Sequence, residues 1–189
     1  MLEIYLLNPP IIDSIGNVVS YSYQKKKRSC FVTLDRYDGA ILETLQTDGR
    51  LSNRELAERV GLSAAPCWRR VKRLEDEGYI QNYVAMLDPK KVGIQVLAFA
   101  EISLDNHHAD TLAAFIEAVE QCPEILECHS VTGQCDYLLK IAARDMEAYE
   151  HFLSGRLLQV KGIRSVNTLF SLKQPKQTLT LPILTQPPQ

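Results

Sequence analysis

Residues 52–77 read SNRELAERVGLSAAPCWRRVKRLEDE, and this stretch predicts two short helices joined by a tight turn. Ser52 and Glu55 have the spacing of a capping box, in which the serine hydroxyl and the glutamate carboxylate each accept a backbone N–H of the first turn. Gly61 suits the left-handed residue that ends a helix. Ser63 can cap the second helix, whose first turn tolerates the proline that follows. The pattern is that of a helix-turn-helix, with the second helix as recognition helix.

A third helix is predicted before this pair, and a wing after it. Leu34, Tyr37, Ile41, Leu42 and Leu45 form one apolar helical stripe, which Asp48-Gly49 ends. In the recognition helix Val71 and Leu74 are expected to face inward. After Gly78, residues 79–86 are predicted to form a short strand pair or wing.

The charges are unevenly distributed along a chain whose net charge is −2. Residues 63–73 carry four basic side chains and no acidic one, whereas residues 101–160 carry eleven acidic and three basic side chains. A basic cluster beside an acidic remainder indicates that the first part meets phosphate and the second does not.

From Ile94 onward the spacing of the hydrophobic residues changes, and segments with the period of a strand alternate with segments with the period of a helix, as in an α+β domain. Strands are predicted at 96–104, 125–132, 137–142 and 166–172, with helices from Leu112 and from Asp145 to a stop at Gly162. The order strand, helix, strand, strand, helix, strand is the split βαβ, or ferredoxin-like, arrangement. Two helices on one face leave the other face of the sheet to be covered, and Leu97, Phe99 and Leu139 are expected there, against a second copy of the chain.

Four segments follow from these patterns. Residues 1–33 form an N-terminal extension without sustained period, either an arm or an upstream extension from a misassigned start, whose basic run 25–28 is favoured as a solvated disordered tail over a phosphate contact. The winged helix-turn-helix is assigned to 34–93 and the ferredoxin-like domain to 94–173. Residues 174–189 are proline-rich and are expected to form a tail that packs on a neighbour.

Composition excludes several other classes of protein. No apolar run approaches the roughly 18 residues that span a bilayer, and the first ten residues do not resemble a secretory signal, so a cytoplasmic location is expected. The five scattered cysteines indicate free thiols. Cys122, Cys128, His129 and Cys135 lack the paired spacing of a zinc site, so no metal or cofactor is predicted.

The chain also resembles a known family, that of the Lrp/AsnC "feast/famine" transcription regulators, from about Leu34 to about Ile183. The strings that carry the resemblance are LDRYD (34–38), DGR (48–50), VGLS (60–63), PCWRRVKRLE (66–75), GYI (78–80), ECH (127–129) and GQCDYLLK (133–140). The resemblance implies a winged helix that binds double-stranded DNA. It also implies a ferredoxin-like domain that dimerises and often builds octamers, with a free amino acid bound between dimers near the turn at 133–137.

The candidate DNA contacts follow from the charge pattern and from the resemblance, whereas the candidate effector contacts are what the resemblance implies. The predicted DNA contacts are Asn53, Ser63, Ala64, Pro66, Trp68, Arg69, Arg70, Lys72 and Arg73, although Trp68 fits a core position or the joint between the domains equally well. The predicted effector contacts are Ser130, Thr132, Gly133, Gln134, Cys135, Asp136, Tyr137, Met146, Leu169, Phe170 and Ser171. Leu169 stands where members of the family commonly carry an aromatic residue.

The turn at Gly133–Asp136 has two interpretations. The residues alone favour a hairpin turn whose aspartate bonds its own backbone. The resemblance favours a ligand site, in which Asp136 takes the ammonium of an amino acid and backbone N–H groups hold its carboxylate.

Two other functions compete with a DNA-binding regulator. An enzyme is not predicted, because the sequence contains no phosphate loop, nucleophile elbow or credible metal set. An amino-acid-binding or assembly module without DNA binding is the alternative, and the uninterrupted basic stretch argues against it.

Overall fold

The computed structural model describes residues 11–12, 18–20 and 34–183. Among the described residues the chain divides into two compact units, one of 84–178 and one that joins the helical region up to Tyr83 with the segment from Leu179 onward. The sequence places this boundary ten residues later, between 93 and 94. In the N-terminal extension β1 (Ile11–Ile12) and β2 (Val18–Ser20) pair antiparallel, although no strand period is evident there. The remaining predictions for residues 1–33 lie outside the described residues.

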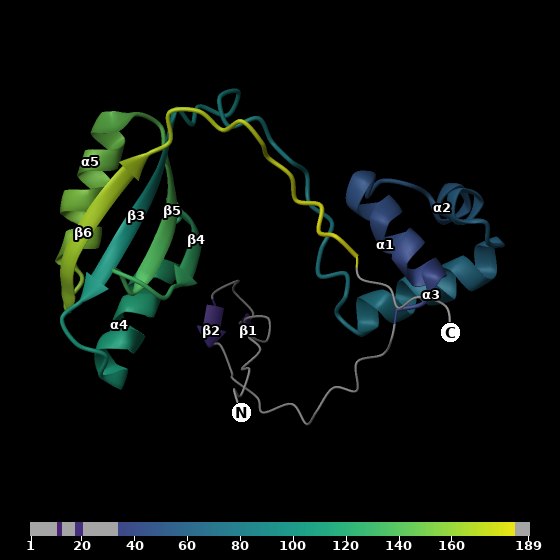
Figure 1. Ribbon diagram of the computed structural model, residues 1–189, viewed down its shortest axis with the longest axis horizontal. Coiled ribbons are helices and arrows are strands. Elements are labelled where there is room, and N and C mark those ends of the chain that lie inside the picture. The colour runs from purple at the N-terminus through teal and green to yellow at the C-terminus, as the bar shows by residue number, and fades with distance from the viewer. Residues whose placement is uncertain (1–10, 13–17, 21–33, 184–189) are drawn as a thin grey trace. The chain divides into compact units, whose positions relative to one another are not determined.

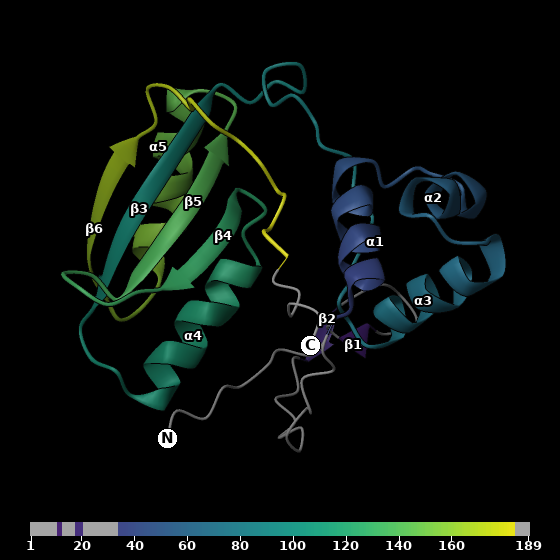
Figure 2. The same cartoon turned by 45° about the vertical axis from the view of Figure 1, so that its right-hand side comes forward.

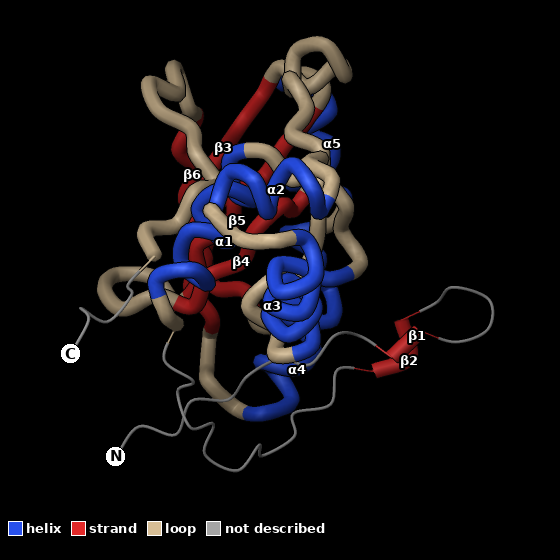
Figure 3. Tube along the Cα trace, turned by 90° about the vertical axis from the view of Figure 1, so that its right-hand side faces the viewer, coloured by secondary structure: helices blue, strands red, loops and turns tan. Residues whose placement is uncertain are grey.

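Three helices form the first unit: α1 (Arg36–Thr47), α2 (Asn53–Val60) and α3 (Ala64–Asp76), grouped together in Figure 3. The capping box of Ser52 and Glu55 is present, and Gly61 is left-handed with φ 70°, so both predictions are confirmed. Ile41, Leu56, Cys67 and neighbouring apolar side chains form a small buried core between the helices. This core fixes α2 against α3 in the helix-turn-helix arrangement.

Two local predictions for this unit are wrong. Ser63 is the N-cap residue of α3, but its side chain makes no capping hydrogen bond. The predicted strand pair at 79–86 is absent, because the chain between α3 and β3 contains no strand. The N–H groups of Tyr79 and Ile80 instead both bond the carbonyl of Leu74, which turns the chain away from the end of α3.

The second unit is a four-stranded antiparallel sheet with two helices, and its element order confirms the predicted ferredoxin-like arrangement. The elements are β3 (Val96–Leu104), α4 (Ala109–Glu120), β4 (Ile125–Ser130), β5 (Tyr137–Ala143), α5 (Met146–Gly155) and β6 (Ile163–Phe170). The strands lie side by side in the order β4-β5-β3-β6 (Figures 1 and 2). As predicted, Asp145 caps α5 by accepting the N–H of Ala148.

The two faces of the sheet differ in what covers them. Ala98, Ala100 and Ile102 of β3 are fully buried against Phe115 of α4 and Phe152 of α5. The alternate residues of β3 lie on the other face, which no helix of this chain covers among the described residues. We call this face the open face, and define it by Leu97, Phe99, Glu101, Leu138, Lys140, Asn167 and Leu169.

Two details of this unit also correct the sequence predictions. Leu139 pairs with Ala100 and is fully buried on the helical side, so it does not belong to the open face. The second helix ends at Gly155 and not at Gly162, because a short 3-10 helix, η1 (Leu157–Gln159), follows and buries Leu157 in the core.

Candidate DNA-reading helix and effector site

The first half of α3 presents an exposed surface that combines small and large side chains. The exposed residues of this surface are Ser63, Ala64, Ala65, Trp68 and Arg69. Trp68 has 57% of its surface accessible. Trp68 is therefore not a core residue. Among the described residues Arg69 has no ion-pair partner. Small residues next to an aromatic ring and an unpaired guanidinium suit close approach to a base edge or a phosphate.

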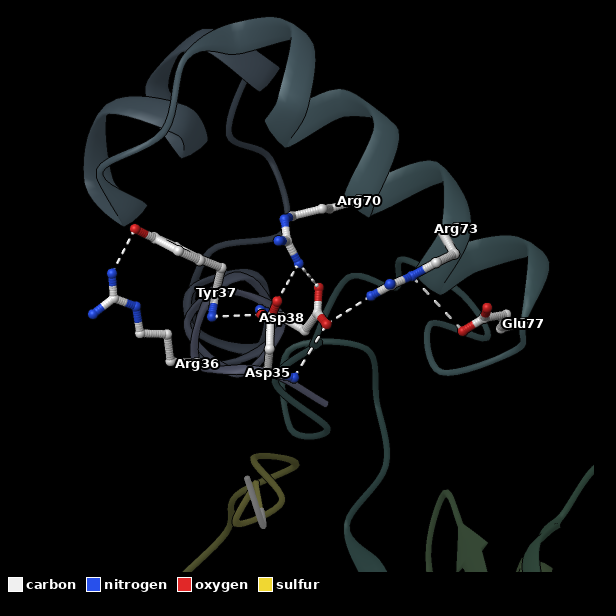
Figure 4. A network of polar contacts seen from close by, with 7 residues as sticks. All are labelled: Asp35, Arg36, Tyr37, Asp38, Arg70, Arg73 and Glu77. Carbon is white, nitrogen blue, oxygen red and sulfur yellow. Dashed lines mark hydrogen bonds and ion pairs between the residues drawn. The ribbon is translucent and has the colours of Figure 1, made fainter. Parts of the chain in front are cut away.

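The second half of α3 holds Arg70 and Arg73, which differ from Arg69 because both are paired with carboxylates (Figure 4). Asp38 of α1 is only 2% exposed. Its Oδ1 accepts a hydrogen bond of 2.7 Å from Nη1 of Arg70, and its Oδ2 lies 2.6 Å from Nη2 of Arg73 in an ion pair. Arg70 also donates to Asp35 at 2.8 Å, and Arg73 lies 3.8 Å from Glu77. We call Asp35, Asp38, Arg70 and Arg73 the anchor cluster.

The anchor cluster also caps the start of α1. Asp35 is the N-cap residue, with its carboxylate accepting the N–H groups of Tyr37 and Asp38, while Asp38 returns a bond to the N–H of Asp35. Partial burial alone would raise the pKa of Asp35, but the bonds from Asp38 N–H and Arg70 outweigh it and hold this pKa below its usual value. Both carboxylates thus join the N-terminus of α1 to α3.

The predicted DNA contacts Lys72 and Asn53 have partners as well. Lys72 is exposed and forms an ion pair of 3.0 Å with Asp76, one turn along α3. Asn53, the first residue of α2, donates a hydrogen bond of 2.9 Å to the carbonyl of Ala64. Asn53 therefore fixes the turn between α2 and α3. Pro66, in the first turn of α3, is half-buried.

The predicted effector turn lies between β4 and β5. Gly133 has φ 134°, a conformation that side chains rarely adopt. Asp136 donates its N–H to Ile102 and accepts, at Oδ2, the N–H of Leu104 at 2.7 Å. Its Oδ1 lies 2.9 Å from Nε2 of His107. The Leu104 N–H, followed by His107, holds the pKa of Asp136 below its usual value, so the carboxylate is an anion at neutral pH.

The other residues of the turn differ in exposure. Thr132, Gly133 and Gln134 are exposed, Cys135 is half-buried, and Ser130 is exposed at the end of β4. The ring centroids of Tyr137 and Phe115 lie 4.6 Å apart with their planes tilted by 42°, so Tyr137 faces the core.

The remaining predicted effector residues lie at the opposite end of the sheet. Ser171 donates its N–H to Leu97 at the start of β3, and Phe170 packs edge-on against Tyr149 at 5.1 Å. Leu169 is 50% exposed on the open face, and Met146 is exposed at the first position of α5.

These two groups do not meet within one chain. The turn contacts Ile102 of β3, whereas the β6 end contacts Leu97. Five residues of strand at about 3.3 Å each separate the two groups by roughly 16 Å. A single small molecule cannot contact both groups of the same protomer.

Several partners in these sites carried no sequence signal. His107 is exposed, and its ring contacts Asp136, which is 29 positions further along the chain. Asp35 and Asp38 fall in the strings that suggested the family, but nothing in their spacing points to Arg70 and Arg73. Asp38 could have been noticed as a charged residue beside the apolar stripe of α1.

Four cysteines fall within the described residues. Cys67, Cys122, Cys128 and Cys135 are free thiols, and burial raises the pKa of Cys67 and Cys128. No cluster suited to a metal ion occurs among the described side chains. None of the described helices combines the length and apolarity needed to cross a membrane.

Comparison with known proteins covers both units. A family model for the winged helix-turn-helix DNA-binding domain matches residues 34–81, and one for the Lrp/AsnC ligand binding domain matches 97–181. The leucine-responsive regulatory proteins of Klebsiella pneumoniae and Escherichia coli K12 are each 45% identical over 153 residues, which is 81% of this chain and 93% of theirs.

Solved structures agree with this result. A transcriptional regulator of Neisseria meningitidis in complex with L-Met is 43% identical with a TM-score of 0.77, over 79% of this chain and 97% of that one. An AsnC family regulator of Agrobacterium tumefaciens is 40% identical with a TM-score of 0.75, over 78% and 96%.

The fold and the exposed helix α3 define a DNA-binding transcription regulator with a separate ligand-binding domain. The chain belongs to the Lrp/AsnC family, as the sequence motifs predict.

Proposed function

We propose that this regulator reads DNA with the exposed half of α3, and that the reading surface is smaller than the basic stretch suggests. The observation that carries the proposal is that the arginines of α3 differ in their partners and in their exposure. Arg70 and Arg73 are held by Asp38, whereas Arg69 lies exposed beside Trp68, Ala64 and Ala65. Arg69 is the residue that contacts a phosphate or a guanine edge, and Arg70 and Arg73 orient the helix.

Replacing Arg69 by alanine tests this surface. Arg69→Ala is expected to weaken operator binding at least about tenfold, because removing a base or phosphate interaction costs about 1–3 kcal/mol per recognition helix. The slope of log affinity against log salt becomes shallower by about 1 for each phosphate that the variant no longer neutralises. A gel-shift titration at several salt concentrations measures both quantities.

The matched control is Arg54→Ala, which removes an exposed arginine of α2 that pairs with Glu58. Its affinity and salt slope are expected to stay near those of the unmodified protein. Equal losses for Arg54 and Arg69 would place the reading surface elsewhere. An unmodified protein that shows no salt-dependent binding to DNA at all would favour the alternative, an assembly module without DNA binding.

We further propose that the effector is a free amino acid, bound where two protomers meet. The relatives include leucine-responsive proteins and a regulator crystallised with L-Met, so leucine and methionine are the first candidates. Asp136 supplies an anion for the ammonium group. Because the turn and the β6 end of one chain are about 16 Å apart, each site combines residues of different protomers.

Thermal-shift measurements with the twenty amino acids test the effector site. A ligand at about 100 times its Kd adds about 2.7 kcal/mol of stability, and this shift is expected to disappear in Asp136→Ala. The comparison is made within each variant, with and without ligand, because the variant also loses the bond to Leu104. Asp110→Ala, an exposed aspartate of α4, is the control that keeps the shift. A shift that survives in Asp136→Ala would remove this carboxylate from the site.

Assembly and location complete the proposal. The open face carries Leu97, Phe99 and Leu169, and a second protomer covers it in a homodimer, from which larger rings such as octamers are built. A dimer places two α3 helices in major grooves about one turn of DNA apart. The protein acts in the cytoplasm, where bacterial and archaeal DNA lies, and it regulates without catalysis.

A further inference from the structure

The segment after β6 returns to the helical unit and contacts α1. Gln46 of α1 donates a hydrogen bond from Nε2 to the carbonyl of Leu181 at 3.1 Å. The N–H of Leu181 donates to Oε1 of the same glutamine at 2.6 Å. One side chain therefore satisfies both backbone groups of one residue, as a neighbouring strand would.

Apolar packing supports this contact two residues further on. Ile183 packs against the buried cluster of the helical unit, which contains Ile41 and Leu42 of α1. Gln46 lies one turn after Leu42 on the same helix, so the polar and the apolar contact fall on neighbouring parts of α1. Residues 179–183 thus extend the core of the DNA-binding unit and form part of the same compact body.

We propose that α1 carries a docking surface for the C-terminal segment 179–183 of the same chain. The DNA-binding domain is then discontinuous in sequence, and two stretches of chain connect it to the ligand-binding domain. One is residues 84–95, and the other is residues 171–178, drawn at the yellow end of the colour scale in Figure 1. Two connections restrict the orientations of a domain more than one connection does.

The second connection has a consequence for regulation that rests on the proposed function. It starts at Ser171, which is bonded to Leu97 beside the candidate effector residues Leu169 and Phe170. A ligand that shifts this end of β6 would pull on a segment that ends on α1. The docking itself does not depend on this consequence and is measured without DNA or ligand.

Amide hydrogen exchange on the full chain tests the docking directly. The Leu181 amide is expected to exchange at least about tenfold more slowly than in a free peptide of residues 178–189, because its N–H is bonded to Gln46. Gln46→Ala removes both bonds and favours the helix, so α1 is retained while the protection of Leu181 is lost. Glu43→Ala, an exposed position one turn earlier, is the control that keeps the protection.

A truncation after residue 178 gives a second measurement. Loss of the segment is expected to lower the melting temperature of the helical unit, measured by the fluorescence of Trp68, by about 5 °C. The free peptide, added in excess, is expected to restore part of this lost stability. Free-peptide exchange rates at Leu181 in the full chain, or an unchanged melting temperature on truncation, would overturn the docking. Protection that falls on dilution would overturn the intrachain form, because a segment supplied by another copy depends on protein concentration.

Discussion

Asp38→Asn is expected to destabilise the DNA-binding unit by about 3 kcal/mol. Asp38 is 2% exposed and carries the negative charge that faces both Arg70 and Arg73. Without this charge, among the described residues Arg70 retains only Asp35, and Arg73 only Glu77 at 3.8 Å. Breaking a buried ion pair costs about 3–5 kcal/mol, and the lower end of that range applies because both guanidinium groups are partly exposed. Asparagine has the same shape and can still accept the N–H of Asp35, so the change isolates the charge from the helix cap.

Urea unfolding followed by Trp68 fluorescence measures this loss, because Trp68 is the single tryptophan and lies on α3. The matched control is Glu77→Gln, which removes an exposed carboxylate 3.8 Å from Arg73 and is expected to change stability by less than about 0.5 kcal/mol. Equal effects of the two substitutions would show that Asp38 contributes no more than a surface charge. The anchor cluster would then not hold α3.

The anchor cluster shows which part of a DNA-binding surface a sequence can reveal. The capping box at Ser52, the break at Gly61 and the apolar stripe of α1 are local patterns, and the structure has all three. The partners of Arg70 lie 32 and 35 positions earlier in the chain, and no periodicity connects them. Four closely spaced cations therefore suggest one basic surface, although two of them are neutralised within the fold.

Contacts between residues that are far apart in the sequence were also unpredictable at the candidate effector site. The order of strands and helices in the second unit follows from hydrophobic period, so the fold was predictable. The contact between His107 and Asp136 and the distance between the two effector groups depend on strand register, which the sequence does not state. Leu139 was assigned to the wrong face for this reason, since its pairing with Ala100 places it among the helices.

The strand pair that was predicted at 79–86, and is absent, shows a different limit of prediction from sequence. Residues 79–86 have the composition of a strand, but a strand needs a partner, and the described chain provides none between α3 and β3. Val84, Met86 and Leu87 are consequently exposed. Strand propensity reports how well a residue suits a pleated surface, and it does not supply the neighbour.

The open face combines apolar and paired polar side chains in a way that suits a protein interface. Phe99 of the central strand lies between Lys140 on β5 and Leu169 on β6. Around it, Glu127 accepts a hydrogen bond from Lys140 at 2.6 Å, and Glu101 accepts one from Asn167 at 2.7 Å. An apolar centre with satisfied polar groups at its edge is the usual anatomy of an interface between subunits.

Phe99→Glu is therefore expected to convert the proposed dimer into a monomer and to weaken operator binding by at least about a hundredfold. Within one protomer the new carboxylate lies beside Lys140, so the sheet retains an opposite-charge pair and folds. In a dimer the same carboxylate would be buried against the partner at a cost of several kcal/mol. Loss of the second recognition helix removes a binding advantage of about 10²–10⁴.

Light scattering coupled to size exclusion gives the mass, and gel-shift titration gives the affinity. The control is Leu158→Glu, which places a carboxylate on an exposed position of η1, away from the open face, and is expected to leave both measurements unchanged. A Phe99→Glu protein that remains dimeric would assign the interface to another surface. A monomer that binds DNA with full affinity would show that a single copy of α3 is sufficient for recognition.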